Sequence, residues 1–208
     1  MTAIIDTAQI TTNRIVHLQA NNITTVIRYL SAINPTGAKC IQPAEAKALA
    51  VAGIRLGLVN EGWGDFAHGG ISAGAGERDG LFCAKYAPKV GASANACIYF
   101  AVDVDATLDQ ITKLVVPYFT AIKPLMASAG YRTGVYGSGD VCDYITASEL
   151  ADLAWLACST GWTGSAEYLA AKPASLALVQ HTPTVLANMD CDTDDAFGDF
   201  GDFMPEWH

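Results

Sequence analysis

Two aspartates stand at the end of the apolar segment IYFAVDVD, which covers residues 98–105. In a β-strand, side chains two positions apart lie on the same face, about 6.6 Å apart along the chain. Asp103 and Asp105 therefore share a face with Tyr99 and Ala101, while residues 98, 100, 102 and 104 form an apolar face. Two neighbouring carboxylates repel each other, which raises the pKa of one of them and lets it hold a proton near neutral pH. A protonated acid beside an anion is a pair suited to general acid catalysis.

Polar side chains recur at the ends of other apolar segments. Acids stand there in the first, third, fourth and last of these segments, as Asp6, Glu61, the pair Asp103 and Asp105, and the pair Asp190 and Asp192. Further polar residues in the same position are Arg28, Tyr29, Asn60, Tyr136, Ser159, Gln180 and His181. Any single acid is also explained by a helix N-cap or a solvated loop. Recurrence across four segments favours one shared site.

The elements that must position these side chains alternate between strands and helices. Strand-like segments cover residues 3–6, 25–30, 54–61, 96–103, 133–137, 153–158, 176–181 and 188–192. Helical patterns cover roughly residues 12–20, 43–52, 76–87, 108–128, 139–145 and 165–171, with a kink or break expected at Pro117 and Pro124. Such alternation predicts a parallel sheet. We therefore expect an α/β fold, a single compact (β/α)8 TIM-type barrel, with residues 1–208 as one domain and the site at the carboxyl ends of the strands.

The charge and the apolar runs of the chain exclude several classes of partner. The net charge is −9, and Lys and Arg are not clustered, which argues against nucleic acid and anionic lipid. No apolar run approaches the roughly 18 residues that a membrane-spanning helix needs. The start of the chain, MTAIIDTAQ, has neither the basic nor the long apolar region of a secretory signal. We expect no nucleic-acid partner, no membrane insertion and no signal peptide.

Cysteine and metal motifs give little support to a cofactor. The six cysteines form no CxxC pair, and Cys97 and Cys158 fall in strand-like segments, where we expect reduced, buried thiols. The segment DCDTDDAFGDFGD (190–202) begins like a calcium loop, but Asp195 replaces the turn glycine and Gly201 replaces the bidentate glutamate. The four histidines show no metal spacing. We expect no metal and no cofactor, and we interpret the glycine-rich segment 68–77 as a loop over the barrel mouth.

Several segments together resemble one family. IIDTAQI, VIRYL, PAEAKALAVAGIRLGLVNEGW, IYFAVDVD and GVYGSGDVC are similar to the glycoside-hydrolase-like domains long described as a domain of unknown function. Those domains are similar in turn to the lysozyme-type glycoside hydrolases of family 25. The resemblance extends from Asp6 to Asp192 and implies that Asp6, Asp103 and one of Asp190 or Asp192 match acids of the lysozyme-type site. Asp105 stands where that family has its catalytic Glu. Its side chain is one methylene shorter, so its carboxyl group lies closer to the backbone.

The resemblance implies a peptidoglycan glycan-strand hydrolase of the lysozyme or muramidase type, in which carboxylate acid catalysis is assisted by the N-acetyl group of the substrate. We expect Asp105 to donate the proton, with Glu61 as the alternative donor, and Asp103 and Asp6 to complete the catalytic set. Expected sugar-binding residues are Arg28, Trp63, Tyr136, Trp162, Gln180, Asp190 and Asp192. The alternative function is a glycan-binding barrel that does not cleave its ligand.

The expected partner is the glycan of the bacterial cell wall. An enzyme made in the cytoplasm without a signal peptide would reach the wall or the periplasm by another route. Such routes are lysis, as for a phage endolysin, and a secretion machinery, as for an antibacterial effector. The sequence leaves open which glycosidic bond is cleaved and the oligomeric state.

Overall fold

The computed structural model describes residues 3–186 and 188–207 of the chain. The strands are β1 (Ala3–Asp6), β2 (Ile23–Leu30), β3 (Arg55–Asn60), β4 (Cys97–Ala101), β5 (Arg132–Gly137), β6 (Leu153–Leu156), β7 (Leu176–Gln180), β8 (Thr184–Leu186) and β9 (Met189–Ala196). Strands β1 to β7 lie side by side in chain order, and β9 pairs with both β7 and β1. These strands form a closed barrel, and β8 is a hairpin partner of β9 on its outside.

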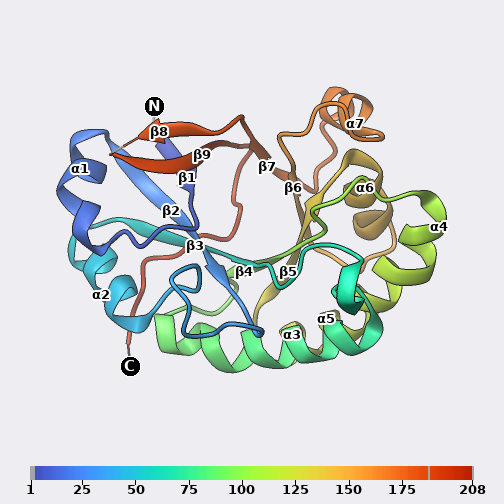
Figure 1. Cartoon of the computed structure of the whole chain (residues 1–208), viewed down its shortest axis with the longest axis horizontal. Coiled ribbons are helices and arrows are strands. Elements are labelled where there is room, and N and C mark those ends of the chain that lie inside the picture. Colours follow the sequence, from blue (N-terminus) through green and yellow to red (C-terminus); the bar gives the residue numbers. More distant parts are fainter. Residues whose placement is uncertain (1–2, 187, 208) are drawn as a thin grey trace.

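Helices follow most of the strands and surround the barrel (Figure 1). They are α1 (Ile15–Ala20), α2 (Pro43–Val51), α3 (Ala73–Tyr86), α4 (Leu108–Gln110), α5 (Val116–Ser128), α6 (Gly139–Ala147) and α7 (Ser165–Ala171). Short 3-10 turns cover Thr12–Arg14, Ala67–Gly69 and Ala87–Val90. Helical segments lie over each expected region, which confirms the predicted α/β alternation.

The last strand corrects the expectation of eight parallel strands. Each neighbouring pair from β1 to β7 is parallel, but β9 is antiparallel to β1 and to β7. A parallel connection needs a crossover of a dozen or more residues. Only residues 181–183 separate β7 from β8, so the chain returns as a hairpin instead of through an eighth helix. The beginning of β9, with Asp190 and Asp192, therefore lies at the same end of the barrel as the carboxyl ends of the other strands.

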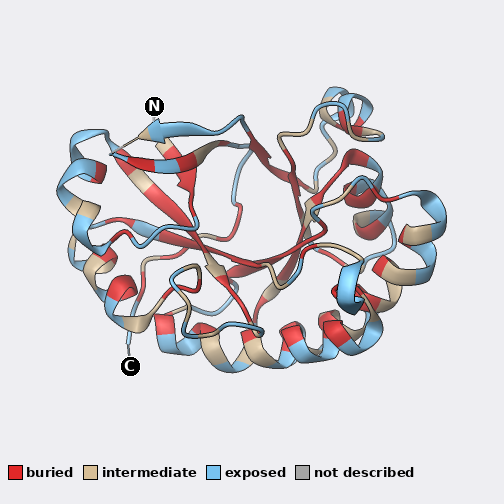
Figure 2. Cartoon of the chain, viewed as in Figure 1, coloured by how far each residue is buried: buried red, intermediate tan, exposed pale blue. Residues whose placement is uncertain are grey.

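The two faces of β4 separate as the alternation in IYFAVDVD predicts. Ile98, Phe100 and Val102 are buried in the core between the barrel and its helices. Tyr99 and Ala101 are buried in a second core inside the barrel. Figure 2 shows the strands as the most continuously buried part of the chain, with exposed residues on the outer sides of the helices.

The regular α-helical pattern is interrupted just before Pro117 and continues across Pro124, and the expected glycine-rich loop is partly helical. The chain stays helical across Pro117 and Pro124, and a π-helical turn at Ile111–Val115 lies just before Pro117, whose ring removes one N–H donor from the helical pattern. The glycine-rich segment 68–77 is helical from Ala73 onward. A Cβ on Gly76 would lie 2.2 Å from the carbonyl oxygen of Tyr118, so this glycine allows α3 and α5 to pack closely.

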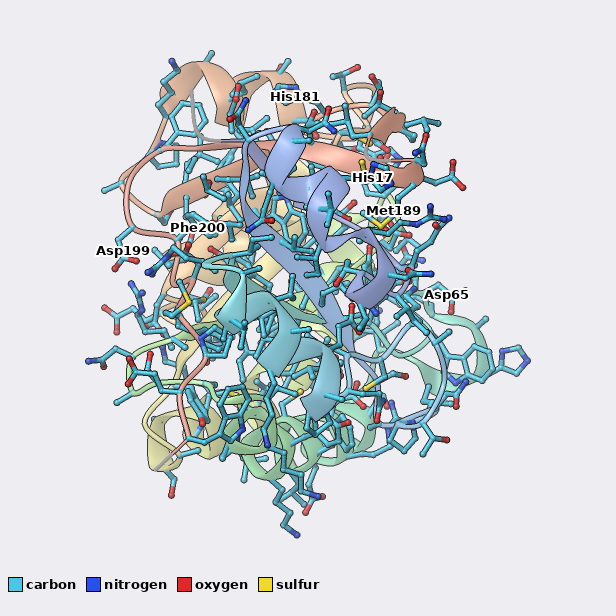
Figure 3. The ribbon with its side chains drawn as sticks, turned by 90° about the vertical axis from the view of Figure 1, so that its left-hand side faces the viewer. His17, Asp65, His181, Met189, Asp199 and Phe200 are labelled. Atoms are coloured by element: carbon cyan, nitrogen blue, oxygen red, sulfur yellow. The ribbon has the colours of Figure 1, made fainter. Side chains whose placement is uncertain are left out.

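The segment that follows β9 closes the end of the barrel opposite the mouth. Leu56 and Phe203 exchange two backbone hydrogen bonds of 2.8 and 3.0 Å, and the Tyr99 hydroxyl donates to the Phe200 carbonyl oxygen at 2.9 Å. Figure 3 shows Asp199 and Phe200 on one side of the molecule and Asp65, which follows β3, on the other. Ligands therefore have access to the barrel interior from the mouth.

All six cysteines are free thiols. Cys97 is buried at the start of β4, as predicted. Cys158 is partly exposed, because it lies beyond the end of β6 and lines the mouth of the barrel. Among the described residues, no helix has both the length and the apolar character that crossing a membrane requires.

Candidate functional site

A pocket of about 220 Å³ opens at the barrel mouth, at the carboxyl ends of the parallel strands. It is lined by Tyr29, Val59, Glu61, Ala101, Asp103, Tyr136, Trp155, Cys158, Ser159, Gln180 and Asp192. The polar members of this lining lie at or just beyond strand ends, the position in which barrel enzymes carry their catalytic groups. A larger hollow of about 450 Å³ lies between α6 and α7 and shares no lining residue with this pocket.

Glu61 lines the pocket directly after β3. Its carboxylate forms an ion pair with Lys39, whose Nζ lies 3.0 Å from Oε2. The same ammonium lies 4.4 Å from the centroid of the Tyr29 ring. Burial raises the pKa of Glu61, the Lys39 charge opposes that rise, and Asp103 adds to it. Lys39 comes from the loop after β2 and was not among the expected site residues, because no local pattern marks it.

Asp103 lies near Glu61, on the loop after the neighbouring strand β4. Its backbone N–H donates to the Gly64 carbonyl oxygen at 2.7 Å. Gly64 has a φ of +71°, and a Cβ there would lie 3.2 Å from Glu61 Cγ and 3.3 Å from Asp103 Cβ. A glycine is therefore needed for the β3–α3 loop to approach both acids. The Asp103 side chain is exposed at the rim of the pocket, where partial loss of hydration raises its pKa and the charge of Lys39 opposes this rise.

Asp6 belongs to a hydrogen-bonded network at the same mouth. Tyr29 donates to Asp6 Oδ1 at 3.1 Å, and Gln180 Nε2 donates to Asp6 Oδ2 at 2.9 Å and to Asp192 Oδ2 at 3.2 Å. Gln180 Oε1 accepts from the Tyr136 hydroxyl at 2.8 Å. Burial raises the pKa of Asp6 to about 6, and the neighbouring Asp192 adds to the rise. Residues from β1, β2, β5, β7 and β9 are joined by this network.

Asp194 is a buried acid that the sequence interpretation missed. It lies two residues after Asp192 on β9, and Trp155 Nε1 donates to its Oδ1 at 2.8 Å inside the barrel. Burial raises the pKa of Asp194 well above its usual range, and the charge of Asp6 raises it further. The alternation of Asp190, Asp192 and Asp194 with apolar or small residues is the sequence signal that identifies this inward face.

Asp105 lies outside the pocket lining. It is exposed, and its two carboxylate oxygens accept hydrogen bonds from the backbone N–H and the hydroxyl of Thr163, at 2.9 and 3.2 Å. The strand ends at Ala101, so the two-residue alternation no longer applies at Asp105. Asp105 holds the loop that carries Trp162, which also lies outside the lining of the pocket. The position gives no support to the expected role of Asp105 as proton donor.

Arg28 is placed away from the mouth. It is fully buried on the outer face of β2 and forms an ion pair with Glu45, with Nε 2.9 Å from Oε1. Its other nitrogens donate to the carbonyl oxygens of Thr7 and Ala38 at 2.6 and 3.0 Å. This geometry contradicts direct contact between Arg28 and a ligand in the pocket, because the guanidinium faces α2 and its donors are engaged by the protein.

The remaining expected residues lie around the pocket. Asp190 and Asp192 line an adjoining hollow of about 210 Å³ together with Asp6 and Tyr29. The Asp190 carboxylate is exposed and accepts from Gln9 Nε2 at 2.9 Å. Trp63 lines another hollow, which shares Glu61 with the mouth pocket. No group of His, Cys, Asp or Glu side chains within the described ranges has the arrangement of a metal site.

The model of one protein family, the Rv2525c-like, glycoside hydrolase-like domain, matches residues 16–191. The chain belongs to this family. The family name describes likeness to glycoside hydrolases, in agreement with the resemblance noted in the sequence.

Two uncharacterized proteins of Bacillus subtilis (strain 168) are similar in sequence. FadG is 30% identical over 165 residues, which are 77% of this chain and 28% of FadG. YbfG is 33% identical over 101 residues, which are 45% of this chain and 14% of YbfG. The chain thus spans less than a third of either relative.

Solved structures share the fold. The Tat-secreted protein Rv2525c of Mycobacterium tuberculosis superimposes with a TM-score of 0.78 at 20% identity, over 97% of this chain and 98% of that one. An uncharacterized B. stearothermophilus protein gives a TM-score of 0.65 at 16% identity, over 96% and 98% of the two chains. At these identities the likeness establishes the barrel architecture.

Proposed function

We propose that the barrel mouth hydrolyses glycosidic bonds in the glycan strands of bacterial peptidoglycan. The observation that carries this proposal is the placement of Glu61 and Asp103 in one pocket, at the ends of neighbouring strands and both with raised pKa values. Glycoside hydrolysis needs a proton donor for the leaving oxygen and an anion for the cationic transition state. Membership of a glycoside hydrolase-like family supports the same reaction class.

In the proposed reaction Glu61, protonated when substrate is bound, gives its proton to the glycosidic oxygen as the bond from that oxygen to the anomeric carbon breaks. The carbonyl oxygen of the substrate N-acetyl group attacks the anomeric carbon and forms a cyclic oxazolinium intermediate. Asp103 stabilises the positive charge and accepts a hydrogen bond from the amide N–H. Water then attacks the anomeric carbon, its proton passes to the Glu61 carboxylate, and the ring opens to restore the amide.

Glu61 replaces Asp105 as proton donor in this proposal because Glu61 lines the pocket. Asp6, Gln180 and Asp192 have positions suited to holding sugar hydroxyl groups. Asp192 lines both the mouth pocket and the adjoining hollow, so its carboxylate is placed to accept a hydrogen bond from a ligand.

A second candidate function is glycan binding without cleavage. It is favoured by the ion pair between Lys39 and Glu61, because the ammonium at 3.0 Å stabilises the ionised carboxylate and opposes proton donation. The presence of Asp105 where the lysozyme-type family has a Glu points in the same direction.

The proposal is tested with purified cell walls. The wild type should lower the turbidity of a wall suspension and release dye from labelled walls, and mass spectrometry of the products should show new reducing ends. Glu61→Gln should abolish both signals. Walls that bind the protein but release no fragments would establish the binding function instead. We further propose that the protein meets its substrate at the wall or in the periplasm, after release by lysis or by a secretion machinery.

A further inference from the structure

A second hollow lies beside the mouth pocket, and we infer that it binds the adjacent sugar ring of an extended glycan. This inference rests on the proposed glycan substrate. The hollow has a volume of about 320 Å³, lies between the loops that follow β2 and β3, and has Ile33, Asn34, Lys39 and Trp63 in its lining. Glu61 lines both this hollow and the mouth pocket. A glycan that occupies both therefore places the bond between two sugars beside the Glu61 carboxyl.

Two large apolar side chains in the wall of this hollow are partly exposed. Trp63 is 49% exposed and Ile33 is 39% exposed. A Cβ on Gly62 would lie 3.1 Å from Ile33 Cδ1, so a glycine at this position lets the two loops meet and form one surface. The His68 ring packs against the Trp63 indole, with centroids 5.1 Å apart and a tilt of 32°. The indole is thus supported by the protein while about half of its surface stays available to a ligand.

The chemistry of the lining suits a sugar ring, including an N-acetylated one. The C–H groups of a sugar ring present an apolar face that stacks on an aromatic ring such as Trp63. The Lys39 ammonium and the Asn34 amide supply donors for hydroxyl and acetyl oxygens. An apolar wall with a few polar groups is the usual composition of a small-molecule site.

A third hollow also adjoins the mouth pocket. The hollow that contains Asp6 and Asp190 shares Tyr29 and Asp192 with the mouth pocket. The three hollows are therefore neighbours, with Glu61 in the lining of one pair and Asp192 in the lining of the other.

Calorimetric titration with N-acetylglucosamine oligomers, from monomer to tetramer, tests the second hollow. The measurement uses the Asp103→Asn variant, so that cleavage does not deplete the ligand. Affinity should rise with oligomer length, and adding Trp63→Ala should weaken binding of the longer oligomers about tenfold while leaving the monomer unchanged. Trp63→Phe should recover most of the loss. Trp207→Ala is the matched control, because Trp207 is 40% exposed and its indole N–H donates to the Lys89 carbonyl oxygen, outside all three hollows.

The outcomes separate this inference from the proposed reaction. If Trp63→Ala binds every oligomer as its parent does, the second hollow is not a sugar site, even if the wild type degrades walls. If the length-dependent affinity depends on Trp63 but walls stay intact, the second hollow is supported and the hydrolase proposal fails. Absence of oligomer binding to both the wild type and the Asp103→Asn variant would overturn the inference.

Discussion

Lys39 and Glu61 form an ion pair that joins the loop after β2 to the end of β3, with Nζ 3.0 Å from Oε2. The Lys39 charge favours the ionised form of Glu61, whereas burial favours the protonated form. The protonation of the proposed acid is therefore set by two opposing effects, and one of them can be removed by a single substitution.

Lys39→Met should raise the pKa of Glu61, because burial and the neighbouring Asp103 then act without an opposing charge. A proton donor must be protonated to work, so the high-pH limb of the wall-hydrolysis profile should move to higher pH. Dye-release rates measured from pH 4 to pH 9 would show the shift. Lys89→Met is a suitable control, since Lys89 lies over the Tyr86 ring and outside the mouth. An unchanged high-pH limb would show that Lys39 does not affect the pKa of the proton donor.

Glu61→Gln should reduce activity, whereas Asp105→Asn should leave it unchanged. Loss of a general acid costs about 10² to 10⁴ in rate, so Glu61→Gln should reduce wall hydrolysis by that factor and leave the fold intact. Asp105→Asn should retain activity, because Asp105 bonds Thr163 outside the pocket. Dye release and circular dichroism of both variants provide the comparison. Loss of activity in Asp105→Asn with full activity in Glu61→Gln would restore Asp105 as the donor.

Arg28→Met should destabilise the fold. Activity should fall only as far as the folded fraction of the protein falls. Removing one member of a buried ion pair costs about 3–5 kcal/mol, because the other charge is left buried without its partner. Here the residue left is Glu45, which is also buried. Urea unfolding would measure the change. Lys113→Met, which breaks the exposed pair with Asp109, should change stability by less than about 1 kcal/mol. A stable Arg28→Met variant with impaired glycan binding would support a direct role in the site instead.

Asp194→Asn should stabilise the protein at neutral pH. The folded state raises the pKa of Asp194, so it holds a proton that the unfolded chain releases above about pH 4. The stability contributed by such a group is fully present below the unfolded-state pKa and is lost as pH rises through the folded-state pKa. Asn keeps an oxygen for the Trp155 N–H and has no proton to lose. Urea unfolding at pH 5 and pH 8 should show a smaller loss of stability in the variant than in the wild type; equal losses would contradict the prediction.

Gly201→Ala should be more destabilising than Gly53→Ala. Both glycines have positive φ, +83° and +73°, where a Cβ costs roughly 1–2 kcal/mol. A Cβ on Gly201 would also lie 2.2 Å from Cys97 Cβ, whereas nothing lies within 4 Å of one on Gly53. The additional cost of Gly201→Ala would report how strongly the segment after β9 is held against the barrel. Equal melting temperatures for the two variants would show that this segment adapts without cost.

The sequence by itself determined the barrel class and the nature of its site. Alternation of strand and helix patterns predicted the elements, and the two-residue alternation around Phe100 predicted which side of β4 faces the helices. Acids at strand ends predicted a carboxylate site at the mouth, and Glu61, Asp103 and Asp192 line that pocket. These features depend on local periodicity, which can be recognised from consecutive residues of the sequence.

The tertiary structure decided the rest, because it depends on contacts between distant segments. In β2 the residues around Arg28 and Tyr29 are apolar on both faces, so only pairing with β1 and β3 decides that Tyr29 faces inward and Arg28 outward. The antiparallel direction of β9 follows from closing the barrel after a short connection. Lys39 meets Glu61 because two neighbouring parallel strands end at the same rim. Local sequence patterns do not predict such contacts between distant residues, because strand order and register determine them.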